Sequence, residues 1–348
     1  MKLFERNAKA LEFDKVLEKL AEFTSCEDAR ENALNLRPES SLAMAQALLN
    51  QTADAHMLLA RFGGPSFGGL KNVNNALSRA NAGSVLNTRE LLDIAGVLRV
   101  IRTLSQWRES NAGVHSVLDP LFNALAPNKY LETAIFNAIV SEDEISDNAS
   151  PALADIRRKI RVQESKVREQ LEKFTRSQTN SKFLQENIIT QRNGRYVVPV
   201  KNEYRSEIAG LVHDTSSSGA TVFIEPMAVV EANNEIRVLQ AKEREEIECI
   251  LYELSVQAGD FAQSIKNSYE CALELNLIFA KAQYAYKIKA MPPILNDSGI
   301  INLRAARHPL IDPKKVVPVD IMLGKDFDTL VITCLLYTSP SPRDLSTS

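Results

Sequence analysis

The hydrophobic pattern of this chain changes its period within Asn193–Asn234, and this change constrains the fold more than any other feature. On both sides the apolar residues recur every three or four positions, which is typical of amphipathic helices. Inside the segment, short runs rich in β-branched and aromatic residues are separated by polar turn clusters, which indicates strands. The predicted strands are Arg195–Lys201, Ile208–His213 and Ala220–Glu225. The pattern therefore predicts a small β-containing tip carried between two long helices.

The two segments that flank the tip each predict a long helix with one apolar stripe. Ser150 precedes Pro151, and this pair favours a helix start with serine as the cap and proline at the first helical position. The first stripe comprises Leu153, Ile156, Ile160, Val167, Leu171 and Phe174, and the second comprises Ile236, Leu239, Ile247, Ile250, Leu254, Ala258, Phe261 and Ile265. Because neither helix is apolar all round and the path between them is short, we expect an antiparallel pair.

Residues 1–148 predict a helical core. Apolar residues at helical spacing predict helices near Phe13–Phe23, Ala43–Leu59, Val73–Ala80 and Thr88–Trp107, the last capped by Asn87 or Thr88. The glycines and the proline in 63–69 predict a loop, because no strand precedes them and no Lys-Ser or Lys-Thr pair follows. The segment Glu142–Asp147 predicts a short acidic loop.

Beyond Pro292-Pro293 the pattern changes to short strands separated by turns. The predicted strands are Ile300–Leu303, Arg307–Leu310, Asp320–Leu323 and Thr329–Thr333. The last is an apolar run of the kind that precedes a phosphate-binding loop in nucleotide-binding folds. The residues that follow, Cys334–Ser348, contain no glycine and show no helical stripe, so we interpret them as a non-native tail on a truncated chain.

The net charge of −3 gives no global argument for nucleic acid, so any basic surface has to be local. Within 151–206 the chain has thirteen Lys and Arg against six Asp and Glu, whereas 228–254 has three against seven. The helical cations, such as Arg157 and Arg161, could equally neutralise the acidic partner helix. For the tip cations the sequence favours contact with nucleic-acid phosphates; these residues are Lys182, Arg192, Arg195, Lys201 and Arg205.

A hydroxyl-rich turn lies between the second and third predicted strands. Ser216, Ser217 and Ser218 could satisfy their own backbone, which is the reading that the sequence favours, or they could contact phosphate. The four histidines have no partner arrangement that suits catalysis; His213 and Asp214 alternate faces of a strand and cannot form a dyad by themselves.

Scattered cysteines and the absence of an apolar leader or membrane-spanning run point to a cytoplasmic protein without disulfides, zinc or a membrane anchor. We therefore expect no metal site and no cofactor within this chain.

Three stretches together resemble the MutS family, and most closely its bacterial type-two branch, which lacks the mismatch-reading domains. They are EFDKVLEKLAEFTSCEDAR, GRYVVPVKNEYRSEIAGLVHDTSSSGATVFIEP, and LRAARHPLID with FDTLVIT. The resemblance covers roughly residues 1–333. It implies a mainly α fold: a helical core, two lever helices that carry a clamp, and an ABC-type ATPase domain, followed by a nuclease-like domain.

The resemblance also implies function: an ATPase and endonuclease that suppresses recombination or splits collided ribosomes, binds DNA, ribosomal RNA or the ribosome, and forms a homodimer. It implies these domains: core 1–148, ascending lever 149–190, clamp tip 191–227, descending lever and core return 228–291, start of the ATPase domain 292–333, and tail 334–348. Val316 and Val317 match positions near the adenine ring of ATP in the family.

The sequence departs from the family where its chemistry begins. Cys334–Tyr337 stands in place of the glycine-rich loop whose amides, lysine and hydroxyl hold ATP phosphates and Mg²⁺. We therefore expect no catalytic residue here and no ATPase or nuclease activity from this chain alone. The alternative function is a structural coiled-coil or dimerisation module that binds no nucleic acid.

Overall fold

The computed structural model describes residues 2–331, and the side chains from residue 6 onward. The chain is mainly α, with 57% helix, 12% strand and small antiparallel sheets, as predicted from the sequence. It folds into two compact units. One contains the described parts of Met1–Lys71, Val100–Ala126 and Asn267–Ser348, and the other contains Asn72–Arg99 and Pro127–Lys266. Within the described residues, no helix is both long enough and apolar enough to span a membrane.

The first unit is a helical bundle around Phe279. Its helices are α1 (Lys2–Ala10), α2 (Phe13–Ala21), α3 (Glu27–Leu34), α4 (Leu42–Phe62), α7 (Asp119–Asn123) and parts of α6 (Thr88–Ser110) and α11 (Ala262–Ile288). The Phe279 ring is fully buried and lies 5.7 Å from the Trp107 ring and 6.1 Å from the Phe67 ring. Leu17 and Leu20 of α2 are buried, as the apolar stripe predicts.

The carboxyl-terminal part of this unit contains one antiparallel ribbon. Strands β7 (Ile301–Ala306) and β8 (Val319–Leu323) pair, close to two of the predicted strands. The predicted strand at Arg307–Leu310 is wrong, because these residues form a turn. Thr329–Val331 has no regular structure, and the rest of that predicted strand and the tail 334–348 lie outside the described residues.

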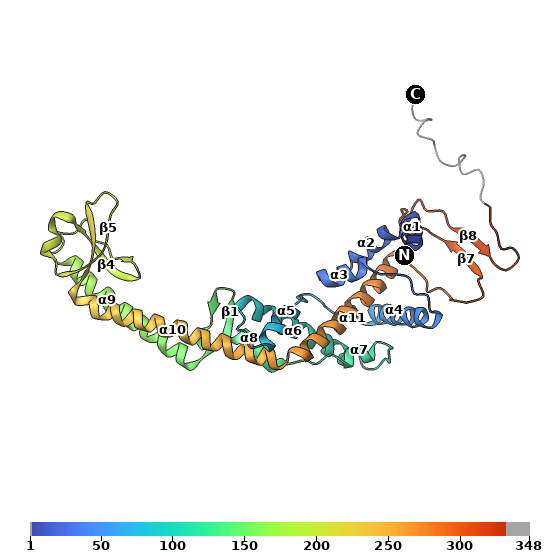
Figure 1. Cartoon of the computed structure of the whole chain (residues 1–348), viewed down its shortest axis with the longest axis horizontal. Coiled ribbons are helices and arrows are strands. Elements are labelled where there is room, and N and C mark those ends of the chain that lie inside the picture. The colour runs from blue at the N-terminus through green and yellow to red at the C-terminus, as the bar shows by residue number, and fades with distance from the viewer. Residues whose placement is uncertain (1, 332–348) are drawn as a thin grey trace, which may run out of the picture. The chain divides into compact units, whose positions relative to one another are not determined.

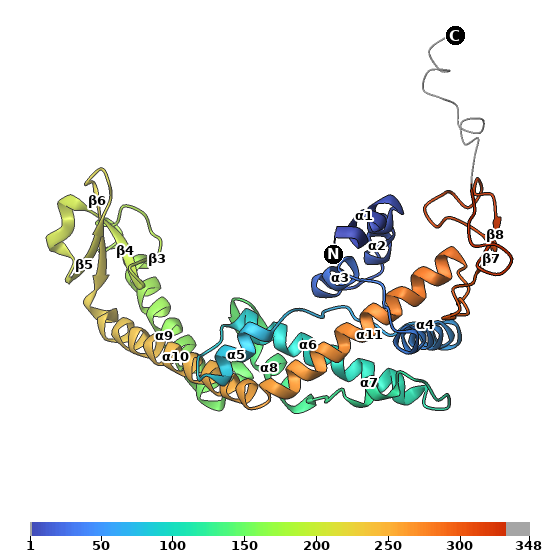
Figure 2. The same cartoon turned by 45° about the vertical axis from the view of Figure 1, so that its right-hand side comes forward.

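The second unit is built on an antiparallel pair of long helices, α9 (Pro151–Arg176) and α10 (Met227–Asp260). As predicted, Ser150 caps α9, and its hydroxyl accepts a hydrogen bond of 2.9 Å from the Leu153 amide. Near the start of α9, Arg157 donates to Glu243 over 2.7 Å; near its end, Leu171 packs with Val229 at the start of α10. The two helices therefore run in opposite directions, side by side (Figures 1 and 2).

Shorter elements pack along this pair. They are α5 (Asn74–Asn81), the first part of α6, α8 (Lys129–Ala138), the 3₁₀ turn η1 (Asp147–Ala149), and a hairpin of β1 (Ile139–Ser141) and β2 (Glu144–Ile145). The hairpin occupies part of the predicted acidic loop. Asn87 caps α6, as predicted: its side chain accepts from the Glu90 amide over 2.9 Å, and Glu90 accepts from the Asn87 amide over 3.2 Å.

The expectation of one helical stripe through Phe261 and Ile265 is wrong at Phe261. Helix α10 ends at Asp260, and Phe261 leaves helical geometry with 44% of its surface exposed before α11 begins at Ala262. The preceding Gly259 touches the backbone of α5, since a Cβ at this position would lie 2.7 Å from the Ala80 carbonyl oxygen. Gly259, next to the end of α10, therefore lies at a close helix–helix approach that apolar spacing does not reveal.

The tip is a four-stranded antiparallel sheet at the end of the α9–α10 pair (Figure 1). Its elements are β3 (Thr190–Arg192), β4 (Arg195–Lys201), the 3₁₀ turn η2 (Asn202–Glu207), β5 (Gly210–Thr215) and β6 (Thr221–Pro226), in the strand order β3-β4-β6-β5. The three predicted strands are present, the middle one shifted by two residues. Strand β3 is additional, and the positive φ angles of Asn193 and Gly194 form its tight turn into β4.

Candidate nucleic-acid interface

Three of the cations that the sequence singled out lie together at the free end of the tip. Lys201 ends β4, and its ammonium donates to the Lys182 carbonyl over 3.3 Å. Arg205 follows in η2 and is exposed, as is Lys182. None of the three forms an ion pair with any carboxylate that the structure describes. Their charges are therefore available to an external anion.

The serine turn lies at the same end of the sheet. The Asn202 amide, directly after Lys201, donates to the Ala220 carbonyl over 2.9 Å. Ser216 Oγ accepts from the Thr221 amide over 3.1 Å and lies 3.3 Å from the Ser218 hydroxyl. Ser216 thus serves its own turn, in agreement with the reading that the sequence favours, whereas Ser217 and Ser218 are exposed on the turn at this end of the sheet.

Arg195 lies at the opposite end of the sheet and is bound within the protein. Its guanidinium donates to both carboxylate oxygens of Glu225 over 2.9 Å and to Asn234 over 2.6 Å. Its side chain is 13% exposed and that of Glu225 is fully buried. Contact of Arg195 with phosphate stays a prediction, and this geometry disfavours it. Release of Arg195 would leave the buried Glu225 carboxylate unpaired.

The Glu225 carboxylate has further hydrogen-bond partners that the sequence did not reveal. Asn233 donates to Glu225 over 2.7 Å, and His213 Nε2 lies 2.5 Å from the other carboxylate oxygen. The register of β5 against β6 shifts between Val212 and Asp214, so His213 occupies a β-bulge. We call Arg195, His213, Glu225, Asn233 and Asn234 the buried ion cluster. It joins three strands to α10.

Tyr196 connects the same end of the sheet to both long helices. Its amide donates to Asn233 over 3.3 Å, and its hydroxyl donates to Glu164 of α9 over 3.1 Å. Burial raises the pKa of the Tyr196 hydroxyl, and the neighbouring Glu164 carboxylate raises it further. The hydroxyl therefore stays protonated and remains a hydrogen-bond donor at neutral pH.

Arg192 is partly neutralised. Its guanidinium lies 3.4 Å from an Asp214 carboxylate oxygen and 4.2 Å from the centre of the Phe223 ring. The five predicted cations thus divide into three without a carboxylate partner among the described residues, one held by an exposed carboxylate, and one in the buried ion cluster.

The positive charge that the sequence placed in 151–206 is concentrated on α9 rather than on the tip. Pro151–Arg176 contains eight Lys and Arg against four Asp and Glu, whereas residues 177–226 contain five against five. The tip is therefore neutral as a whole, and any anion contact there depends on how the charges are distributed.

Val316 and Val317 lie in the segment between β7 and β8. Val317 is 75% exposed, and the Val316 amide donates to the Asp312 carbonyl over 2.9 Å. Their place near an adenine ring stays a prediction. Cys334–Tyr337, which stand where the family has its phosphate-binding loop, lie outside the described residues. In the part of the chain that is described, no three His, Cys, Asp or Glu side chains are grouped as metal ligands.

These observations define a class: mainly α proteins in which an antiparallel helix pair carries a small sheet with exposed cations at its free end. No protein-family model matches the chain. It is 43% identical over 332 residues to a protein named endonuclease MutS2 from Acetivibrio thermocellus, 44% over 334 residues to that of Ruminiclostridium cellulolyticum, and 44% over 331 residues to that of Clostridium perfringens.

Each match covers 94% of this chain and 42% of the relative. The chain is a homologue of MutS2 proteins over their amino-terminal part, which confirms the resemblance to the type-two branch of the MutS family. It spans less than half the length of these relatives.

Proposed function

We propose that this chain is the lever-and-clamp part of a MutS2-like, nucleic-acid-dependent ATPase, and that its tip contacts the phosphate backbone without reading sequence. Two facts support the proposal. The relatives are named endonucleases, enzymes that act on nucleic acid. At the free end of the tip, Lys182, Lys201 and Arg205 are without a carboxylate partner among the described residues, and this observation carries the proposal.

The chemistry of this surface suits a backbone rather than a base. Lysine and arginine neutralise phosphates, and serine hydroxyls add hydrogen bonds to phosphate oxygens, without any sequence information. Ser217 and Ser218 are exposed on the turn at the same end of the sheet as Lys201. Binding through such a surface releases counterions, so its affinity falls steeply as salt rises.

The test neutralises Lys182, Lys201 and Arg205 together, each to Gln. We expect weaker binding to duplex DNA and to structured RNA, equally for all sequences, and a salt dependence shallower by about 0.9 in log–log slope for each phosphate that is no longer neutralised. Fluorescence anisotropy at several salt concentrations measures both. Unchanged affinity and slope would contradict the proposal.

A matched control uses the three carboxylates that share the tip surface. Changing Glu186, Glu203 and Glu207 to Gln removes the opposite charges from the same exposed region. This variant should bind more tightly, because less repulsion opposes the phosphates. If both triple variants bind like the wild type while the chain sediments as a dimer, the dimerisation module becomes the better account.

For the complete protein we propose the family's reactions, ATP hydrolysis with Mg²⁺ and cleavage of nucleic acid, in a cytoplasmic homodimer that acts on DNA or on the ribosome. The printed sequence contains no GxxxxGK[ST] loop. We therefore expect no measurable ATP binding by this chain alone, even with Val316 and Val317 present. Equilibrium dialysis with ATP and Mg²⁺ tests this expectation.

A further inference from the structure

We propose that the outer face of α9 is a second phosphate-binding surface, and that it extends the nucleic-acid path from the tip along the helix. This inference rests on the proposed function and goes beyond it, because it assigns a site outside the tip. We call this surface the α9 groove; it is lined by Arg158, Arg161, Val162, Ser165, Lys166 and Glu169.

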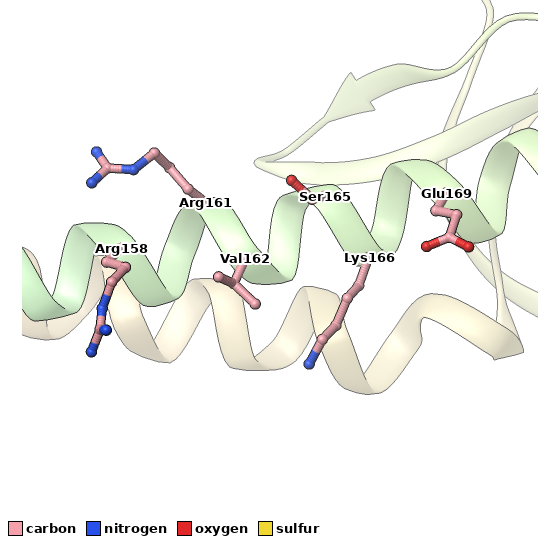
Figure 3. Close-up of a pocket in the computed structure, with 6 residues that line it drawn as sticks. All are labelled: Arg158, Arg161, Val162, Ser165, Lys166 and Glu169. Carbon is pink, nitrogen blue, oxygen red and sulfur yellow. The ribbon is translucent and has the colours of Figure 1, made fainter.

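The groove is a shallow surface cavity of about 440 Å³ on one side of a single helix (Figure 3). Its residues recur at spacings of three and four, so they form one helical face. Figure 3 shows Arg158, Val162 and Lys166 pointing to one side of the helix, and Arg161 and Ser165 to the other. Val162 is 49% exposed, whereas Val167 and Leu171 on the inner face are buried.

The local carboxylates neutralise these cations only in part. Asp155 is shared between Arg158 and Lys159. Asp147 is shared between Arg161 and Arg157, and Arg157 also pairs with Glu243 of α10. Each aspartate therefore faces two positive charges. These hydrogen bonds hold the pKa of both carboxyls below the usual range, Lys159 contributing most at Asp155 and Arg157 most at Asp147.

The remaining groove charges also leave an excess of positive charge. Glu169 is bound by Lys173 over 2.7 Å. Lys166 forms no ion pair with any described carboxylate. Because the groove is open and its cations recur along one helix, on both of its edges, it suits an extended polyanion better than a compact small molecule.

The dimensions fit a nucleic-acid backbone. Arg158 and Lys166 are eight positions apart, which is about 12 Å along a helix, and duplex DNA presents about seven phosphate charges over that length. Helix α10 carries eight Asp and Glu against three Lys and Arg, so it repels a polyanion from the other side of the pair. The exposed Ser165 hydroxyl can donate to a phosphate oxygen.

The test compares short and long duplexes. From the end of α9 back to Arg158 is about 27 Å, the length of about eight base pairs, so an 8-base-pair duplex cannot cover the tip and the groove at once. A 24-base-pair duplex can. The variant changes Arg158, Arg161 and Lys166 to Gln, and the control changes Arg237, Lys242 and Arg244 of α10 to Gln, which alters the net charge equally.

We expect the α9 variant to lower the ratio of 24- to 8-base-pair affinity about tenfold at low salt, and the α10 control to change it less than about twofold. Circular dichroism checks that both variants keep their helices. An unchanged ratio in the α9 variant overturns the inference. In that case, weaker binding of both duplexes by the tip variant, in which Lys182, Lys201 and Arg205 are changed to Gln, would still support the proposed function.

Two further outcomes separate the alternatives. If neither the α9 variant nor the tip variant loses affinity for any duplex, the proposed function fails together with the inference. If the α9 variant loses binding to a polyglutamate peptide but not to the duplexes, the groove binds an acidic protein, and the inference is overturned.

Discussion

The two ends of the tip use the same residue types for opposite purposes. At the end nearest the helices, Arg195 donates to a fully buried carboxylate and is itself almost enclosed. At the free end, Lys201 and Arg205 stand without a carboxylate partner among the described residues. Sequence patterning treats these cations alike. The comparison teaches that burial, and not residue type, decides whether a positive charge holds the fold or is available to a ligand.

The difference has an energetic basis. A buried carboxylate has lost its hydration, so it depends on the hydrogen bonds that Arg195, Asn233 and His213 provide. An exposed cation keeps its water and can exchange that water for phosphate at little cost.

The largest effect is expected from Glu225→Gln. The change leaves the enclosed Arg195 guanidinium without its counter-charge, and breaking such a buried pair costs about 3–5 kcal/mol. We expect the β4, β5 and β6 amides to lose protection in hydrogen exchange. The control is Asp214→Asn, whose partner Arg192 is 40% exposed, and which should cost less than about 1 kcal/mol. Equal protection in the two variants would show that the buried ion cluster does not hold the tip.

A smaller effect, on binding alone, is expected from Asp147→Asn combined with Asp155→Asn. These changes release the cations of the α9 groove, so a 24-base-pair duplex should bind about fivefold more tightly. Because both pKa values lie below the usual range, the wild-type carboxyls stay charged down to about pH 5, and the difference from the variant should persist there. Anisotropy at pH 7 and pH 5 measures it. Weaker binding by the variant would contradict the groove.

The smallest effect is expected from Arg192→Gln. Its guanidinium already pairs with Asp214 and lies over the Phe223 ring, so its charge is largely neutralised within the protein. We expect the affinity for duplex DNA to change less than about twofold. Titration of duplex DNA with this variant and with Arg205→Gln provides the comparison. A larger loss of affinity for the Arg192 variant than for the Arg205 variant would contradict the assignment of Arg205, and not Arg192, to phosphate contact.

Much of the fold could be predicted from local sequence patterns. Ser150 before Pro151 predicts the start of α9, and β-branched runs predict three of the four tip strands, because caps and strand periodicity depend on neighbours in sequence. The end of α10 at Asp260 escaped prediction, since the apolar spacing continues through Phe261 and Ile265. The short β3 carries too few apolar residues to stand out.

The candidate site was less predictable for a related reason. Arg195 and Glu225 are thirty positions apart and meet only because β6 inserts between β4 and β5. The contact of His213 with Glu225 further requires a β-bulge, which leaves no mark in the sequence. Charge counting over 151–206 located an excess of cations, but only the helix boundaries assign that excess to α9.

The attachments of the tip to its two helices differ in kind, and this decides which helix the tip follows. To α10 it is joined by directional hydrogen bonds, from Arg195 to Asn234 and between Tyr196 and Asn233. To α9 it is joined by apolar packing around Val167 and Leu171 and by the hydrogen bond from the Tyr196 hydroxyl to Glu164. A displacement of α10 along its own axis would therefore strain several hydrogen bonds to the sheet at once, whereas the same displacement of α9 would strain one.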